Sequence, residues 1–158
     1  MMDNDRGPRL PLPPPVLLLL ALVAAIILDW APPHFLAPPV GFNPQVILGA
    51  LLVIGSLLLV SSAVREFRRE GTNVVPTRPA LKIVTTGPYR FTRNPMYLSM
   101  VLFLLGLSLV FSLEWGIIFM PILWIGYDRL IVAREEAYLS AKFGGGYQIL
   151  LDKTRRWF

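Results

Sequence analysis

The sequence predicts an all-α integral membrane protein with four transmembrane helices, a C-terminal helical hairpin and short cytoplasmic amphipathic helices. Apolar residues make up 54% of the 158 residues, and the mean hydropathy is +0.58. Charged residues reach only 16%, against about 25% in a typical soluble domain. The apolar residues gather in four runs, with the basic residues between them. Because so much apolar surface requires lipid, we expect one membrane domain over 16–158.

Each element follows from its local composition. We expect a disordered or extended segment over 1–15, because its prolines disfavour a helix. The first apolar run covers about 16–30 and is short for a bilayer, whereas the second, 44–64, begins with proline and is long enough to cross. The third run, 96–113, and the fourth, 115–133, are separated by one residue. These last two runs should therefore pack as an antiparallel hairpin.

The distribution of basic residues predicts the orientation in the membrane. Seven Lys or Arg residues lie in the connection 65–95 and five in the tail 134–158, whereas 30–43 holds none. The positive-inside rule then places the connection, the tail and both termini in the cytoplasm. We expect a bacterial inner-membrane protein. The tail is too charged to span, so it should continue as a helix to about Phe143, break at 144–146 and end in a short amphipathic helix.

Composition also excludes several kinds of site. The chain has no cysteine and a single histidine, His34, so it can form neither a thiolate metal site nor a histidine metal cluster. We expect no metal. The basic residues are not interleaved with exposed aromatic residues, and we therefore expect the bilayer, rather than a nucleic acid, as the partner. The sequence leaves the oligomeric state open.

The hairpin brings distant charged residues to the same depth. Tyr97 lies 17 residues before Glu114, and Asp128 lies 14 residues after it. With a rise of about 1.5 Å per residue, the two arms return to the cytoplasmic boundary together. Arg93, Asn94 and Tyr97 should thus face a set of charged residues across a pocket with apolar walls. That set is Asp128, Arg129, Glu135 and Glu136, of which Arg129 and Glu136, seven apart, should share a helix face.

Two interpretations of these charges stay open at this point. Charged side chains near hydrocarbon are costly and usually mark a site. Alternatively, the arginines snorkel to the headgroups and the glutamates are their solvated partners. The residue pattern alone names no reaction.

Two motifs flank the hairpin, TTGPYRFTRNPMYL at 85–98 and REEAYLSAKFGGGY at 134–147. In this order they resemble the isoprenylcysteine carboxyl methyltransferase family and its bacterial relatives. The shared pattern is Gly-x-Tyr, Arg-His/Asn-Pro-x-Tyr, a hairpin, Glu-Glu-x-x-Leu and Phe-Gly-x-x-Tyr. The resemblance covers about 81 to 158, roughly half of the chain, and it rests on the ordered combination rather than on any single short motif.

This resemblance implies methyl transfer from S-adenosylmethionine, which becomes S-adenosylhomocysteine, to a lipophilic or lipid-linked acceptor such as a carboxylate. Asn94 stands where the eukaryotic members have histidine, and Ile131 where they have a substrate-binding arginine, for which Arg129 is the nearest replacement. Arg93, Arg129 and Glu136 are the candidate catalytic residues. The residues that the resemblance assigns to cofactor binding are Leu81, Lys82, Ile83, Val84, Tyr89, Asn94, Pro95, Met96, Tyr97 and Glu135.

Other functions remain as alternatives. Relatives with this hairpin also methylate phospholipid amines and small thiols. NADPH-dependent sterol or enone reductases of membranes share a similar C-terminal pattern, and a non-catalytic membrane scaffold would keep the same pocket. A soluble dinucleotide-binding fold is not expected, because no Gly-x-Gly-x-x-Gly follows a strand.

Overall fold

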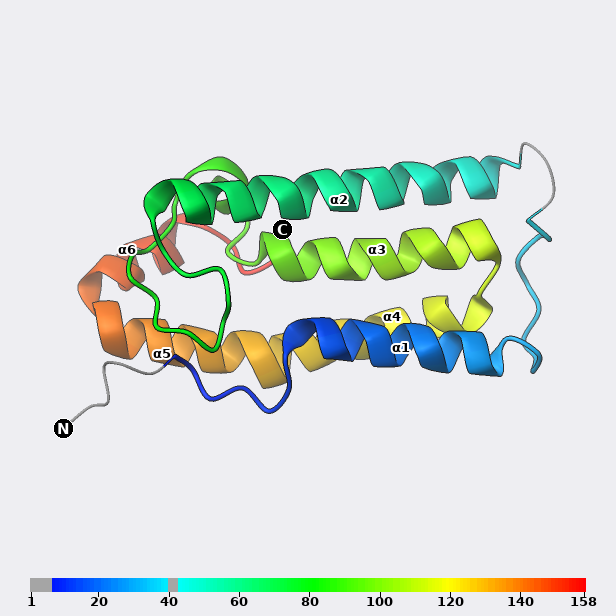
Figure 1. Ribbon diagram of the computed structural model, residues 1–158, viewed down its shortest axis with the longest axis horizontal. Helices are drawn as coiled ribbons and strands as arrows, with labels where there is room; N and C mark the ends of the chain where they lie inside the picture. Colours follow the sequence, from blue (N-terminus) through cyan, green and yellow to red (C-terminus); the bar gives the residue numbers. More distant parts are fainter. Residues whose placement is uncertain (1–6, 40–42) are drawn as a thin grey trace.

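The computed structural model describes residues 7–39 and 43–158, and its long helices lie side by side (Figure 1). Within the described residues there is no β-strand, only an isolated bridge between Thr92 and Arg155. The all-α prediction is confirmed. The elements in chain order are α1 (Pro14–Leu28), α2 (Pro44–Glu70), the 3-10 helix η1 (Gly87–Arg90), α3 (Pro95–Phe111), α4 (Glu114–Gly126), the π-helix η2 (Tyr127–Val132), α5 (Ala133–Phe143) and α6 (Gly145–Lys153).

Proline marks the start of three helices. Pro14, Pro44 and Pro95 each lie in a first turn, where the missing N–H would have had no partner within the helix. For this reason α1 begins two residues before the predicted start at 16. The side chain of Asn43 caps α2 by accepting a 2.9 Å hydrogen bond from the Gln45 amide.

Two helices are long and apolar enough to cross a membrane. They are α2, Pro44–Glu70, and the continuous helix formed by α4, η2 and α5, Glu114–Phe143. Their most apolar windows have mean hydropathies of 2.5 and 1.6, yet only 17% and 28% of these windows are buried inside the protein. The core helix of a soluble protein would be mostly buried, so this exposure indicates contact with lipid. The helices α1 and α3 are shorter, at 15 and 17 residues. A topology of four membrane crossings with both termini in the cytoplasm therefore stays a prediction.

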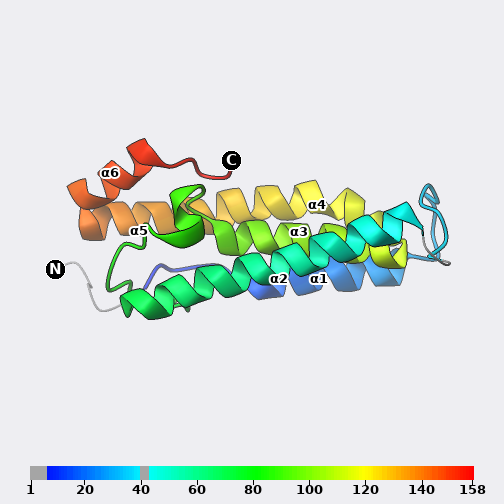
Figure 2. The same ribbon diagram turned by 90° about the horizontal axis from the view of Figure 1, so that it is seen from above.

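The two ends of the bundle differ in character (Figures 1 and 2). At one end, Gln45 of α2 ties the loop after α1 to the tight α3–α4 turn. Its Oε1 accepts a hydrogen bond from the Ala37 amide at 3.1 Å, and its Nε2 donates to the Leu109 carbonyl at 3.0 Å and to the Ser112 hydroxyl at 3.1 Å. At the other end lie the connection between α2 and α3, the end of α5, and α6. The residues of both family-like motifs therefore gather mainly at this second end.

Two glycines let α2 and α3 approach closely. A Cβ atom added at Gly106 would lie 2.9 Å from the Gly49 carbonyl oxygen and 2.9 Å from the Val53 amide nitrogen. A Cβ added at Gly49 would in turn lie 2.8 Å from the Gly106 oxygen. Small residues at such contacts are typical of helix pairs in membranes, where association depends on backbone packing. This contact sets the separation of the two helices that carry the polar end.

Substituting Gly106 with alanine should destabilise the helix pair. Because the added methyl group meets backbone atoms, which cannot rotate away, we expect a cost of about 1–3 kcal/mol. The measurement is thermal unfolding in one detergent. Gly55→Ala is the matched control, since a Cβ at Gly55 meets nothing within 4 Å and alanine favours the helix more than glycine. Equal melting temperatures for the two variants would contradict this packing.

Candidate active site

The hairpin brings its two arms together as predicted. The Tyr97 hydroxyl, at the start of α3, donates a 2.6 Å hydrogen bond to Oε1 of Glu135 in α5. Arg93 Nε and Nη2 donate to Oε1 of Glu136 at 3.3 and 3.2 Å. Only 12% of the Arg93 side chain and 14% of the Glu136 side chain are exposed. The charged residues of the two motifs thus pair across the hairpin rather than point separately into solvent.

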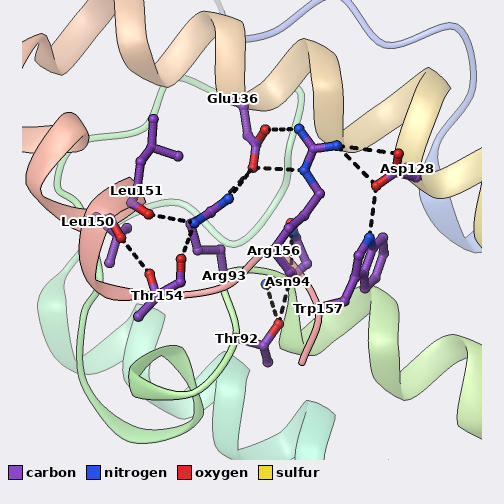
Figure 3. Close-up of polar contacts among 10 residues, drawn as sticks. All are labelled: Thr92, Arg93, Asn94, Asp128, Glu136, Leu150, Leu151, Thr154, Arg156 and Trp157. Carbon is purple, nitrogen blue, oxygen red and sulfur yellow. Dashed lines mark hydrogen bonds and ion pairs between the residues drawn. The ribbon is translucent and has the colours of Figure 1, made fainter.

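Glu136 also binds a second arginine, from the end of the chain (Figure 3). Arg156 Nε donates to Glu136 Oε1 at 3.2 Å, and its Nη2 contacts Oε2 closely. The same guanidinium donates to Asp128 Oδ1 at 3.2 Å, and Trp157 Nε1 donates to that oxygen at 2.8 Å. The hydrogen bond to Glu136 raises the pKa of Arg156, which therefore stays charged. We call Arg93, Asp128, Glu136 and Arg156 the charge network.

The backbone of the tail is fixed in the same place. The Arg156 carbonyl accepts hydrogen bonds from the Thr92 hydroxyl and from Asn94 Nδ2, both at 3.0 Å. The Arg93 amide donates to the Arg155 carbonyl at 3.0 Å, and Arg93 Nη1 donates to the carbonyl oxygens of Leu151 and Thr154. The tail beyond α6 thus folds back onto the start of α3. Sequence reasoning missed this contact and counted Arg156 only among the basic residues of the tail.

The expectation that Arg129 and Glu136 share a helix face is wrong. It assumed a regular α-helix, but residues 127–132 form a π-helix, which takes one extra residue into its turn. Positions eight apart then face the same way, as Asp128 and Glu136 do, and positions seven apart do not. The Arg129 side chain is 80% exposed and its Nε lies 3.7 Å from Asp128 Oδ2. Its proposed role with the substrate stays a prediction.

A cavity opens beside the charge network. Its empty space, including the part open to solvent, is about 900 Å³. Leu81, which is largely exposed, and Arg129 are the two predicted site residues that do not line it. The predicted residues that do are Lys82, Ile83, Val84, Tyr89, Arg93, Asn94, Pro95, Met96, Tyr97, Glu135 and Glu136; the lining residues that sequence reasoning missed include Phe67, Val74, Val75, Arg78, Tyr138, Leu139, Tyr147 and Leu150.

The connection between α2 and α3 forms one wall of this cavity. The Thr72 hydroxyl accepts hydrogen bonds from the amides of Leu81 and Lys82, at 3.0 and 3.3 Å, and the Tyr138 hydroxyl accepts one from the Ala80 amide at 3.2 Å. These bonds fix residues 80–82 against Thr72, which follows α2, and against α5. Thr72 gave no signal in the sequence, because its role depends on a loop that returns to it nine and ten residues further on.

The remaining walls are apolar and aromatic. Val84 and Tyr89 are buried in a small cluster with Ala63, and the Tyr89 ring lies 5.2 Å from that of Phe67. Burial raises the pKa of Tyr89, and burial raises the pKa of Tyr147 to about 12. Both phenols are therefore neutral at physiological pH, and they can stack or donate hydrogen bonds but cannot act as anions.

The Glu135 carboxylate differs from its neighbour in having an unused oxygen. Its Oε1 accepts the Tyr97 hydrogen bond, while Oε2 has no partner among the residues that the structure describes. Glu136, by contrast, uses both oxygens on the two arginines. The cavity therefore presents one carboxylate oxygen that is available to a ligand.

Comparison with known proteins agrees with this geometry. A family model described as phospholipid methyltransferase matches residues 44–146, which run from the start of α2 past the end of α5. An "Uncharacterized protein" of Haemophilus influenzae (strain ATCC 51907 / DSM 11121 / KW20 / Rd) is 44% identical over 64 residues, covering 39% of this chain and 98% of that protein. No solved structure matches the chain. The matched region includes most of the cavity lining, and the chain belongs to the phospholipid methyltransferase family, a family of membrane methyltransferases.

Proposed function

We propose that this protein transfers a methyl group from S-adenosylmethionine to a lipophilic acceptor, with a carboxylate as the preferred acceptor class. One observation carries the proposal: a single cavity combines a fixed arginine, a carboxylate with a free oxygen, and apolar and aromatic walls. The cavity lies at the polar end of helices whose outer faces are apolar and exposed. A water-soluble donor and a lipid-soluble acceptor can both reach such a position.

The residues present fit an amino-acid zwitterion joined to an adenosine. Glu135 Oε2 can accept hydrogen bonds from an ammonium group. Arg93 uses four of its five N–H groups on Glu136, Leu151 and Thr154, which leaves one on Nη2 for a carboxylate. Val84 and Tyr89 supply apolar and aromatic surface for a purine. Both signs of charge and a flat apolar wall thus occur in one cavity.

The chain's own residues would bind and orient rather than react. When bound, S-adenosylmethionine supplies a methyl group that its sulfonium already activates. The protein then needs no nucleophile of its own, and its contribution is to align the acceptor and to exclude water. Two exposed basic residues, Arg78 and Lys82, belong to the lining, and Lys82 Nζ also lies 4.0 Å from Glu70 Oε2. The positive charge that they bring favours an anionic acceptor, which is why we prefer a carboxylate over an amine or a thiol.

Titration of the purified protein in detergent tests the cofactor. We expect saturable heat of binding with S-adenosylmethionine and none with NADPH, measured by isothermal calorimetry under the same conditions. Binding of NADPH alone would instead support a membrane reductase. Binding of neither would support a scaffold and overturn the proposal.

Glu135→Gln should weaken binding of the methyl donor. The substitution keeps the side-chain shape but removes the charge that faces the ammonium group, and a charged hydrogen bond of about 1.5–3 kcal/mol corresponds to roughly 10- to 100-fold in affinity. The same calorimetric titration measures it. Asp152→Asn, which neutralises an exposed acid on α6 outside the cavity lining, is the matched control. Unchanged affinity in the Glu135 variant would remove that residue from the site.

Arg156→Gln should also weaken donor binding, although Arg156 does not line the cavity. Without it Glu136 loses the partner that fixes it against Arg93, and we expect roughly a tenfold loss, the scale of one charged hydrogen bond. Arg156→Lys should restore affinity in part, because a lysine keeps the charge but cannot form the paired contacts of a guanidinium. Arg69→Gln, at an exposed position on α2, is the control.

Circular dichroism separates positioning from folding in this series. If the Arg156→Gln protein keeps its helical content and melting temperature but loses affinity, Arg156 acts by positioning Glu136 and Arg93. If affinity stays at the wild-type value in a folded Arg156→Gln protein, the charge network has no part in donor binding.

A further inference from the structure

A second groove lies on the other side of the segment that forms the cavity wall. Along 88–94 the side chains divide between the two: Tyr89, Arg93 and Asn94 line the cavity, whereas Pro88, Arg90, Phe91 and Thr92 line the groove. The tail residues from Lys153 to Arg155, with Trp157 and Phe158, complete the groove. Its empty space, including the part open to solvent, is about 940 Å³.

The polar part of this groove is positively charged. Arg90, Lys153 and Arg155 are all exposed and line it, and no acidic residue does. None of the three forms an ion pair with a residue in the described part of the chain. They come from segments more than 60 residues apart, which the bridge between Thr92 and Arg155 holds together. The convergence is thus a property of the fold and not of one basic stretch of sequence.

The rest of the groove is apolar and continues onto the lipid-exposed helices. Leu59 belongs to the membrane-crossing α2, and Leu98 lies in the first turn of α3. Phe91 and Phe158 are 78% and 65% exposed beside the three basic residues. An apolar floor that begins in the bilayer and ends at a cluster of cations is complementary to an amphiphile with a negatively charged head.

We propose that this groove binds an anionic phospholipid of the bilayer, with its phosphate-bearing headgroup at Arg90, Lys153 and Arg155 and its acyl chains along Leu59 and Leu98. The site is separate from the cavity and does not depend on methyl transfer. Bound lipid would contact the outer side of the segment 88–94, whose inner side lines the cavity.

Lipid binding to the full chain tests this inference. The protein, purified in detergent, is titrated with phosphatidylglycerol or with phosphatidylcholine, and bound lipid is counted by native mass spectrometry. We expect retention of phosphatidylglycerol in preference to the zwitterionic lipid. Because each basic residue near an anionic headgroup contributes about a fivefold factor, Arg90→Ala with Arg155→Ala should weaken that binding roughly 25-fold. Lys153→Ala alone should weaken it roughly fivefold.

The control variant is Arg68→Ala with Arg69→Ala, which removes the same charge from exposed positions about 14 Å further along α2 than Leu59. We expect this protein to keep the preference of the wild type. Equal losses in the two double variants would show only a diffuse basic surface and overturn the inference. Equal binding of the two lipids by the wild type would also overturn it. Neither result bears on S-adenosylmethionine binding, so the proposed function is judged separately.

Discussion

Glu136 is bound by two arginines that lie 63 positions apart in the sequence, and the polar end of the protein is arranged around that carboxylate. A carboxylate as little exposed as this one would be costly without partners, so both guanidinium groups must stay in place. Arg93 fixes the start of α3, and Arg156 fixes the tail. Since Arg156 also reaches Asp128, the three chain segments at this end hold one another in position.

The π-helix makes this arrangement possible. In a regular α-helix Asp128 and Glu136 would lie about 80° apart around the axis, and one guanidinium could not readily bind both. The extra residue in the turn brings them to the same side, where Arg156 bridges them. A π-helical segment is less regular than an α-helix and often occurs at functional sites. Here its consequence is specific, because it directs Asp128 toward the tail and leaves Arg129 outside the cavity.

The sequence predicted those parts of the site that depend on local pattern. Apolar run lengths and a one-residue separation predicted the hairpin, and the rise per residue then predicted that Tyr97 and Arg93 would meet Glu135 and Glu136. It could not predict that Arg156 binds Glu136 and Asp128, because a tail that folds back onto the bundle produces no periodic pattern in the sequence. It also could not reveal the π-helix, since nothing in YDRLIV distinguishes it from an α-helix.

The two adjacent glutamates on one helix have different roles, since Glu136 holds the fold together and Glu135 offers a carboxylate oxygen to a ligand. Neighbouring positions on a helix point about 100° apart, so Glu135 and Glu136 meet different surroundings. Glu136 faces the two arginines, and both of its oxygens are used in holding the fold. Glu135 faces Tyr97 and the cavity, where one oxygen is left. Since the nearby guanidinium groups are already bound to Glu136, that oxygen of Glu135 is left for a cationic group entering the cavity.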